Sequence, residues 1–148
     1  MMQKLFKQKN QGFTLVETLV AISIFTMSIL GLMSVLASGI SNTNYAQQKM
    51  TATYLAQEGI EYVRNKRDTS VLYHNGGSQA GWNNFKNDPN IDNITPPPPS
   101  DTNFSRIIQK TTIPGNPNEV KISSTVSWTQ GSGNYNIVFS ENLFNWIE

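Results

Sequence analysis

Glu17 is the side chain whose type and position in this sequence most strongly indicate a functional role. It is the only acidic or basic side chain between Phe13 and Gln48, and most of that run is apolar. An ionised carboxylate inside a membrane helix costs at least ~2.5 kcal/mol on insertion scales, so such a residue is expected to have a partner and a function. No basic side chain in the run can be that partner.

A free α-amino group is a partner that the run itself can supply. Gly12 and Phe13 form the junction between a polar leader and the apolar run. A cut at this junction would place a new amine one helical turn before Glu17. The amine could neutralise the carboxylate within one chain or on a neighbouring chain, and both pairings remain open at this point.

The element that carries Glu17 is predicted to be a membrane-length helix over residues 13–40. Its 28 residues make a helix of about 42 Å, enough to cross a ~30 Å hydrocarbon core. A secretory signal would have an apolar region of roughly 7 to 15 residues, and a soluble domain of this size seldom encloses such a helix. An uncleaved membrane anchor explains the length of the run but gives no role to Glu17.

The leader, residues 1–12, predicts the orientation of this helix. It carries Lys4, Lys7 and Lys9 and no acid, so the positive-inside rule keeps it in the cytoplasm. The chain is therefore predicted to be a single-pass protein of the cytoplasmic (inner) membrane, with its C-terminal body outside the cytoplasm.

The stretch Gly12-Phe13-Thr14-Leu15-Val16-Glu17, behind a short lysine-bearing leader, resembles the class III signal peptide of type IV pilins and of type II secretion pseudopilins. The resemblance implies cleavage after Gly12 by a prepilin peptidase/methylase and N-methylation of Phe13. It also implies that an inner-membrane assembly platform assembles the chain with other pilin or pseudopilin subunits into an extracellular or periplasmic filament. In the core of that filament, Glu17 meets a neighbour's N-terminus. The likeness extends over residues 1 to about 67.

Within this resemblance the stretch Tyr54–Glu61 looks like minor pilins of the V type, which favours a minor pilin over a bulk subunit. A type II secretion pseudopilin is the alternative inside the family. From a different class, the alternative is a membrane-anchored adhesin or DNA-uptake module that does not polymerise. Removal of the leader leaves eight Lys and Arg against ten Asp and Glu, so DNA or a surface ligand has no support from charge.

Composition argues against an enzyme, a metal site or a cofactor. The chain has no cysteine, one histidine (His74) and none of the motifs that mark a nucleophile, a phosphate loop or a zinc site. Asp88, Asn90 and Asp92 have the opening spacing of a calcium loop. The residues where that loop needs Gly and Glu are Asn93 and Pro99, so a turn is the favoured interpretation.

After the membrane segment the helix is predicted to continue over residues 41–67. An amphipathic stripe supports this, and its members are Ala52, Leu55, Ala56, Gly59, Ile60 and Val63. Arg64, Lys66 and Arg67 are interpreted as cations at the negative end of the helix dipole. Residues 68–103 are predicted to form an irregular loop, with Trp82 and Phe85 on one turn of helix and Pro96–Pro99 as a stiff spacer.

Residues 104–148 are predicted to form an antiparallel β-sheet. Phe104–Ile113 is predicted to be one strand. The buried face of the next strand is predicted from residues that alternate with polar ones, namely Val120, Ile122, Ser124, Val126 and Trp128. Tyr135, Ile137 and Phe139 alternate in a third, and the apolar piece from Leu143 to Ile147 is left unassigned. The sheet face and the helix stripe each need a cover, which predicts an α+β, pilin-like fold in which a long N-terminal helix packs on a small sheet.

Overall fold

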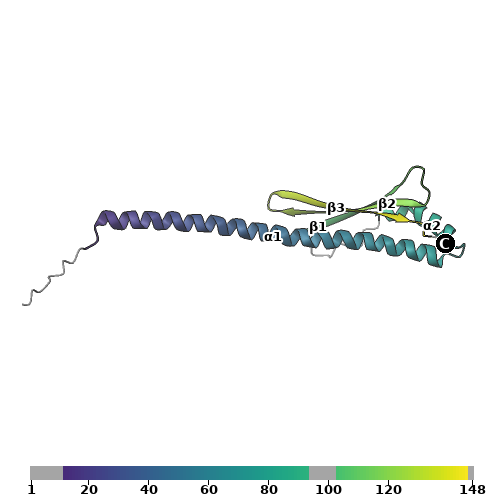
Figure 1. Ribbon diagram of the computed structural model, residues 1–148, viewed down its shortest axis with the longest axis horizontal. Coiled ribbons are helices and arrows are strands. Elements are labelled where there is room, and N and C mark those ends of the chain that lie inside the picture. The colour runs from purple at the N-terminus through teal and green to yellow at the C-terminus, as the bar shows by residue number, and fades with distance from the viewer. Residues whose placement is uncertain (1–11, 94–102, 147–148) are drawn as a thin grey trace, which may run out of the picture. The chain divides into compact units, whose positions relative to one another are not determined.

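The computed structural model describes residues 12–93 and 103–146. In chain order the elements are helix α1 (Leu15–Tyr73), helix α2 (Ser78–Asn87), the 3₁₀ helix η1 (Pro89–Asn93) and strands β1 (Phe104–Thr112), β2 (Glu119–Gln130) and β3 (Gly133–Phe144) (Figure 1). The predicted α+β fold, a long N-terminal helix with a small antiparallel sheet, is confirmed. The chain divides into two compact units, Met1–Thr43 and Asn44–Glu148, and each is described by itself.

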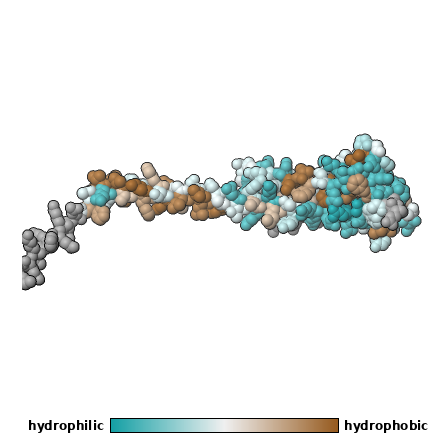
Figure 2. Space-filling view, viewed as in Figure 1, coloured by the Kyte–Doolittle hydropathy of each residue, from teal (hydrophilic) through white to brown (hydrophobic). Residues whose placement is uncertain are grey.

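In the first unit, the described residues form an exposed apolar helix. No residue from 12 to 43 is buried, and apolar colour predominates along this part of α1 in Figure 2. Hydroxyl groups donate back into the helix, as Ser23 Oγ does to the Leu19 carbonyl and Ser28 Oγ to the Ile24 carbonyl, both at 2.8 Å. A helix whose polar groups are satisfied internally, and which is long and apolar enough to cross a bilayer, suits a lipid environment.

The second unit is built on a three-stranded antiparallel sheet in the order β1-β2-β3. The central strand β2 alternates as predicted: its buried side chains are Val120, Ile122, Ser124, Val126 and Trp128. Gly131 has a φ of 59° in the two-residue turn between β2 and β3, a conformation that glycine adopts without strain. The Phe104–Ile113 prediction is confirmed to within one residue at its end.

The apolar stripe of α1 covers this buried sheet face. Leu55 is half-buried, and the other five predicted members, Ala52, Ala56, Gly59, Ile60 and Val63, are buried. Ala52 and Ala56 pack with Val126 and Trp128, while Ile60 and Val63 join a second cluster with Ile108, Ile122 and Leu143. Burial of complementary apolar faces is the main favourable term in such a fold.

The predicted end of the helix near residue 67 is wrong, because α1 continues to Tyr73. Its last turns are held by α2: Val71 is 3% exposed, and Ser70 Oγ donates to the Gly81 carbonyl at 2.8 Å. The cations interpreted as a helix-end cluster are therefore not in the last turn. Two of them pair with acids instead, Arg64 with Glu61 and Glu141 and Arg67 with Asp68.

The stretch 68–103 is also more regular than predicted, since α2 and η1 lie within it. Trp82 and Phe85 are buried on a ten-residue helix rather than on a single turn, and Trp82 Nε1 donates to the Pro117 carbonyl at 3.0 Å. Of the unassigned C-terminal piece, Leu143 and Phe144 belong to β3. Ile147 and the Pro96–Pro99 spacer lie outside the described residues.

Candidate functional site

The predicted cleavage junction lies directly before α1. Gly12, Phe13 and Thr14 precede the first helical residue, Leu15, and all are exposed; residues 1–11 of the leader are outside the described part. A Cβ built on Gly12 meets nothing within 4 Å. The described residues therefore give no packing reason for a glycine at position 12.

Thr14 caps the helix on which Glu17 lies. Thr14 Oγ1 accepts from the Glu17 amide at 3.3 Å, and the Thr14 carbonyl accepts from the Thr18 amide at 3.2 Å. Thr14-Leu15-Val16-Glu17 is the T-x-x-E pattern of a capping box. The sequence analysis missed this cap, and that four-residue pattern was the signal that could have revealed it.

Glu17 itself is an exposed acid in the first turn of α1. The positive end of the helix dipole favours a carboxylate there. Among the described residues, the ion pairs formed by Arg64, Arg67 and Arg106 do not include it. Phe13 and Glu17 thus lie at the same helix end. The backbone amide of Glu17 takes part in the cap, and its carboxylate has no counter-ion within the described chain.

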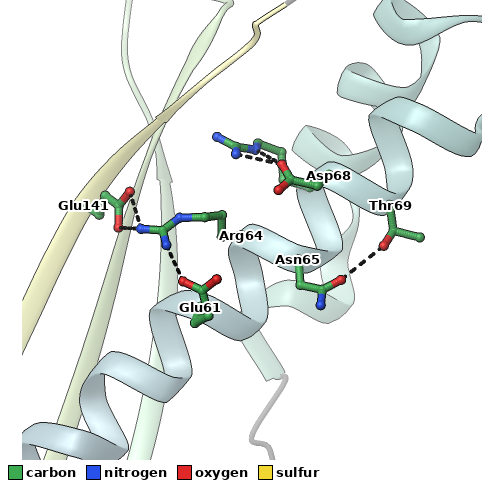
Figure 3. Close-up of polar contacts among 7 residues, drawn as sticks. Glu61, Arg64, Asn65, Asp68, Thr69 and Glu141 are labelled. Carbon is green, nitrogen blue, oxygen red and sulfur yellow. Dashed lines mark hydrogen bonds and ion pairs between the residues drawn. The ribbon is translucent and has the colours of Figure 1, made fainter.

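A second polar site connects α1 to β3 around Arg64 (Figure 3). Arg64 Nη2 donates to both carboxylate oxygens of Glu141, at 2.8 and 2.6 Å, and Arg64 Nη1 pairs with Glu61. The hydrogen bond to Glu141, followed by the charges of Glu141 and Glu61, raises the pKa of Arg64 above its usual value despite some desolvation. The guanidinium is therefore charged throughout the physiological pH range.

A third polar residue, Arg106 on β1, is buried between sheet and helix. Its side chain is 2% exposed, and Nη1 donates to the Leu55 carbonyl at 2.6 Å and to Glu58 Oε2 at 2.8 Å. The sequence analysis did not identify it. The alternation of β1 was the available signal, because Phe104, Arg106 and Ile108 share one face of the strand.

A cavity of about 470 Å³ lies where α1, α2 and η1 meet, with Asp88 on its wall beside Tyr62, Lys66 and Phe85. Asp88 Oδ1 accepts from the Asn90 amide at 2.9 Å, a turn-type contact that agrees with the favoured interpretation. Over residues 12–93 and 103–146, no group of three or more His, Cys, Asp and Glu side chains is arranged to hold a metal ion. His74 is exposed and accepts from the Gly76 amide.

Residues 7–40 match the family described as the prokaryotic N-terminal methylation motif. This motif is characteristic of the prepilin-type signal of type IV pilins and pseudopilins, and it implies processing by a prepilin peptidase. The match covers 34 of the 148 residues and ends before the body begins. No curated protein and no solved structure matches the chain.

Proposed function

We propose that this chain is a prepilin-type filament subunit. It is cut between Gly12 and Phe13, methylated on the new Phe13 amine and assembled through its N-terminal helix into a type IV pilus-like filament, as a minor pilin. One observation carries the proposal: the segment that matches the methylation motif leads into an exposed apolar helix with a single acid in its first turn.

Before assembly, the helix serves as a membrane anchor. The basic leader stays in the cytoplasm, the segment from Phe13 to Ile40 crosses the inner membrane, and the body lies outside. In this position the junction after Gly12 is at the cytoplasmic edge of the bilayer, where a membrane peptidase can reach it. The assembly platform then moves the mature helix out of the lipid.

During assembly, the Glu17 carboxylate pairs with the Phe13 amine of a neighbouring subunit. A charge that enters an apolar filament core is tolerated only when it is paired and hydrogen-bonded. A neighbour in register supplies the amine, whereas a mismatched neighbour leaves a bare charge. The pair therefore sets subunit spacing, as a buried polar residue sets register in a coiled coil.

The minor-pilin assignment rests on the stretch Tyr54–Glu61. Part of that stretch has a packing reason, because a Cβ on Gly59 would lie 2.6 Å from Ser124 Oγ. Close contact between helix and sheet is enough to explain the glycine. Its presence therefore does not favour a minor pilin over a type II secretion pseudopilin. The pseudopilin remains the alternative inside the family.

A non-polymerising membrane anchor is the alternative from a different class, and the Thr14 cap favours it. Because Glu17 follows Thr14 at capping-box spacing, the acid has a use within a single helix that needs no neighbour. This anchor would present the body as an adhesin or DNA-uptake module. It predicts that removing the Glu17 charge leaves function intact, whereas the filament subunit requires that charge.

Mass spectrometry of the mature protein tests the processing step. Purified from cells with an active prepilin peptidase, the chain is expected to begin at Phe13 and to carry one N-terminal methyl group. Gly12→Val should remain uncut, because a branched side chain crowds a protease cleft, although the open space at Gly12 predicts no change in fold. Gly12→Ala adds a single methyl group and is the control, expected to retain cutting. Recovery of intact Met1 from peptidase-competent cells would contradict the proposal.

A further inference from the structure

In the part of the chain that the structure describes, no strand pairs with the outer edge of strand β3. It is the last strand of the sheet, and all twelve of its residues pair with β2 without a break in register. Antiparallel pairing uses every second backbone N–H and C=O of β3 on the β2 side, so the remaining groups face outward. Among residues 12–93 and 103–146, no further backbone hydrogen bond from Gly133–Phe144 satisfies them.

This edge lacks the features with which proteins usually protect an edge strand. Such features include lysine, proline and bulges, and β3 contains neither of these residues and no bulge. Its one charged residue, Glu141, is engaged by Arg64 of α1. The opposite edge strand, β1, carries Arg106 and Lys110, and Lys110 Nζ donates to the Asp88 carbonyl beside η1 at 2.7 Å.

A groove of about 280 Å³ runs between this edge and α1. Ile60 and Phe139 contribute its apolar surface, and Glu61, Arg64 and Glu141 contribute its charged surface. Figure 3 shows Arg64 reaching from α1 toward Glu141 on β3, with Glu61 beside it. Two carboxylates share one guanidinium, so the groove carries a net negative charge. Glu61 is the accessible acid, with 65% of its side chain exposed.

Exposed apolar side chains also gather on and directly after β3. Val138 is 55% exposed and Phe144 52% exposed, and Tyr135 and Trp146 are also exposed. On the outer sheet face Val138 lies in register with Thr125 of β2 and Ile107 of β1, and Ile107 is exposed as well. The β3 edge therefore has outward-facing backbone groups, an acidic groove on the helix side of the sheet and apolar surface on the outer sheet face.

We propose that the outer edge of β3 is a strand-addition site for an extended segment of another protein chain. The segment pairs with the outward-facing backbone groups of β3, lays an apolar side chain over the half-buried Phe139, and places a Lys or Arg against Glu61 and Glu141. A second β3 strand does not fit, because it would bring another Glu141 carboxylate, and no Lys or Arg, against this acidic groove. The inference goes beyond the proposed function and uses none of the residues from 12 to 40.

Hydrogen exchange on the full-length chain tests this site. The ¹⁵N-labelled protein in neutral detergent micelles is mixed with a capped peptide of the order Thr-Lys-Thr-Val-Thr-Lys-Thr, which places Lys, Val and Lys on one face. We expect this peptide to slow exchange at every second amide of β3. A peptide with Glu in place of Lys, and one with N-methylated backbone amides, should bind at least about fivefold more weakly, because they remove the charge pairing and the ladder hydrogen bonds.

Two variants with the same net charge test the acidic groove. Glu61→Gln should weaken binding of the Lys peptide about two- to fivefold, as expected for an exposed ion pair. Asn83→Lys, on the exposed surface of α2, makes the same change in net charge and should leave binding unchanged. Absence of β3 protection, equal binding of the Glu peptide, or an equal effect of the two variants would overturn the proposal. Because processing after Gly12 is not involved, such a result leaves the proposed function standing.

Discussion

Gly59 determines how closely α1 approaches the sheet. A Cβ there would lie 2.6 Å from Ser124 Oγ, 3.1 Å from Arg106 Cδ and 3.3 Å from Ile108 Cδ1. All three neighbours are buried on the strands beneath the helix. Glycine costs roughly 1 kcal/mol of helix propensity relative to alanine, so its presence in the middle of α1 needs such a packing reason.

Gly59→Ala is accordingly expected to destabilise the body by about 1–3 kcal/mol, in spite of the better helix propensity of alanine. Chemical denaturation followed by circular dichroism measures the effect. Gly39→Ala, where a Cβ meets nothing within 4 Å, is the control on the same helix. Adding Ser124→Ala should recover part of the loss, since Ser124 Oγ is the closest atom and has no hydrogen-bond partner among the described residues. An unchanged Gly59→Ala protein would refute the close-approach argument.

At the scale of elements, β2 is the strand that organises the body, and Trp128 is its largest buried side chain. Trp128 is 3% exposed and lies within ring-contact distance of Tyr45, Phe104 and Tyr135. Its Nε1 is buried without a hydrogen-bond partner in the described part of the chain. The ring therefore contributes by apolar and aromatic contact rather than through its N–H.

We expect Trp128→Ala to lower the free energy of unfolding by about 3–5 kcal/mol, and Trp128→Phe to lower it by much less, because the phenyl ring keeps part of the contact and leaves no buried donor. Equilibrium unfolding by circular dichroism gives both values. Trp146→Ala is the comparison, since Trp146 is 46% exposed. Equal losses for Trp128→Ala and Trp146→Ala would show that the aromatic cluster does not stabilise the fold.

The sheet could be predicted from the sequence because its signal is local. Side chains in a strand alternate with period two. The alternation from Val120 to Trp128 therefore indicates which side chains are buried, even when the residues that pack against them are unknown. The end of α1 had no such local signal. Arg64, Lys66 and Arg67 form a basic cluster typical of a helix terminus, but the helix continues past them. Its last turns pack closely against α2 at Gly81, where an added Cβ would lie 2.2 Å from the Ser70 carbonyl oxygen. That contact exists only after α2 has docked.

The candidate site was likewise predictable where its chemistry is local. The Gly12–Glu17 pattern is local and lies inside residues 7–40, which match the N-terminal methylation motif. The Arg64–Glu141 and Arg106–Glu58 pairs, in contrast, join residues 77 and 48 positions apart. No spacing rule connects such distant residues. They became visible only when the strands were placed over α1.

At the scale of the whole molecule, the two units place different demands on their surroundings. The body, Asn44–Glu148, contains every buried apolar residue found in the described chain. The described residues of the other unit bury none of their apolar side chains. An apolar helix of this length requires lipid or other helices around it. In the proposed function, this helix is surrounded first by the lipid bilayer and then by the neighbouring subunits of a filament.

The most direct test of this account is filament entry by the Glu17→Gln variant. Glutamine at the third helical position preserves a capping box but removes the charge, and Thr14→Ala removes the cap but preserves the charge. The measurement is the share of mature chain in sheared, sedimented filaments from cells that make the other subunits. We expect Glu17→Gln to be cut after Gly12 yet to fall at least about tenfold in filaments, because the neighbour's amine is left unpaired. Thr14→Ala should still enter. If Glu17→Gln enters filaments as well as the parent chain, Glu17 does not act between subunits. If the parent chain itself is absent from the filaments, the chain is better described as a membrane anchor.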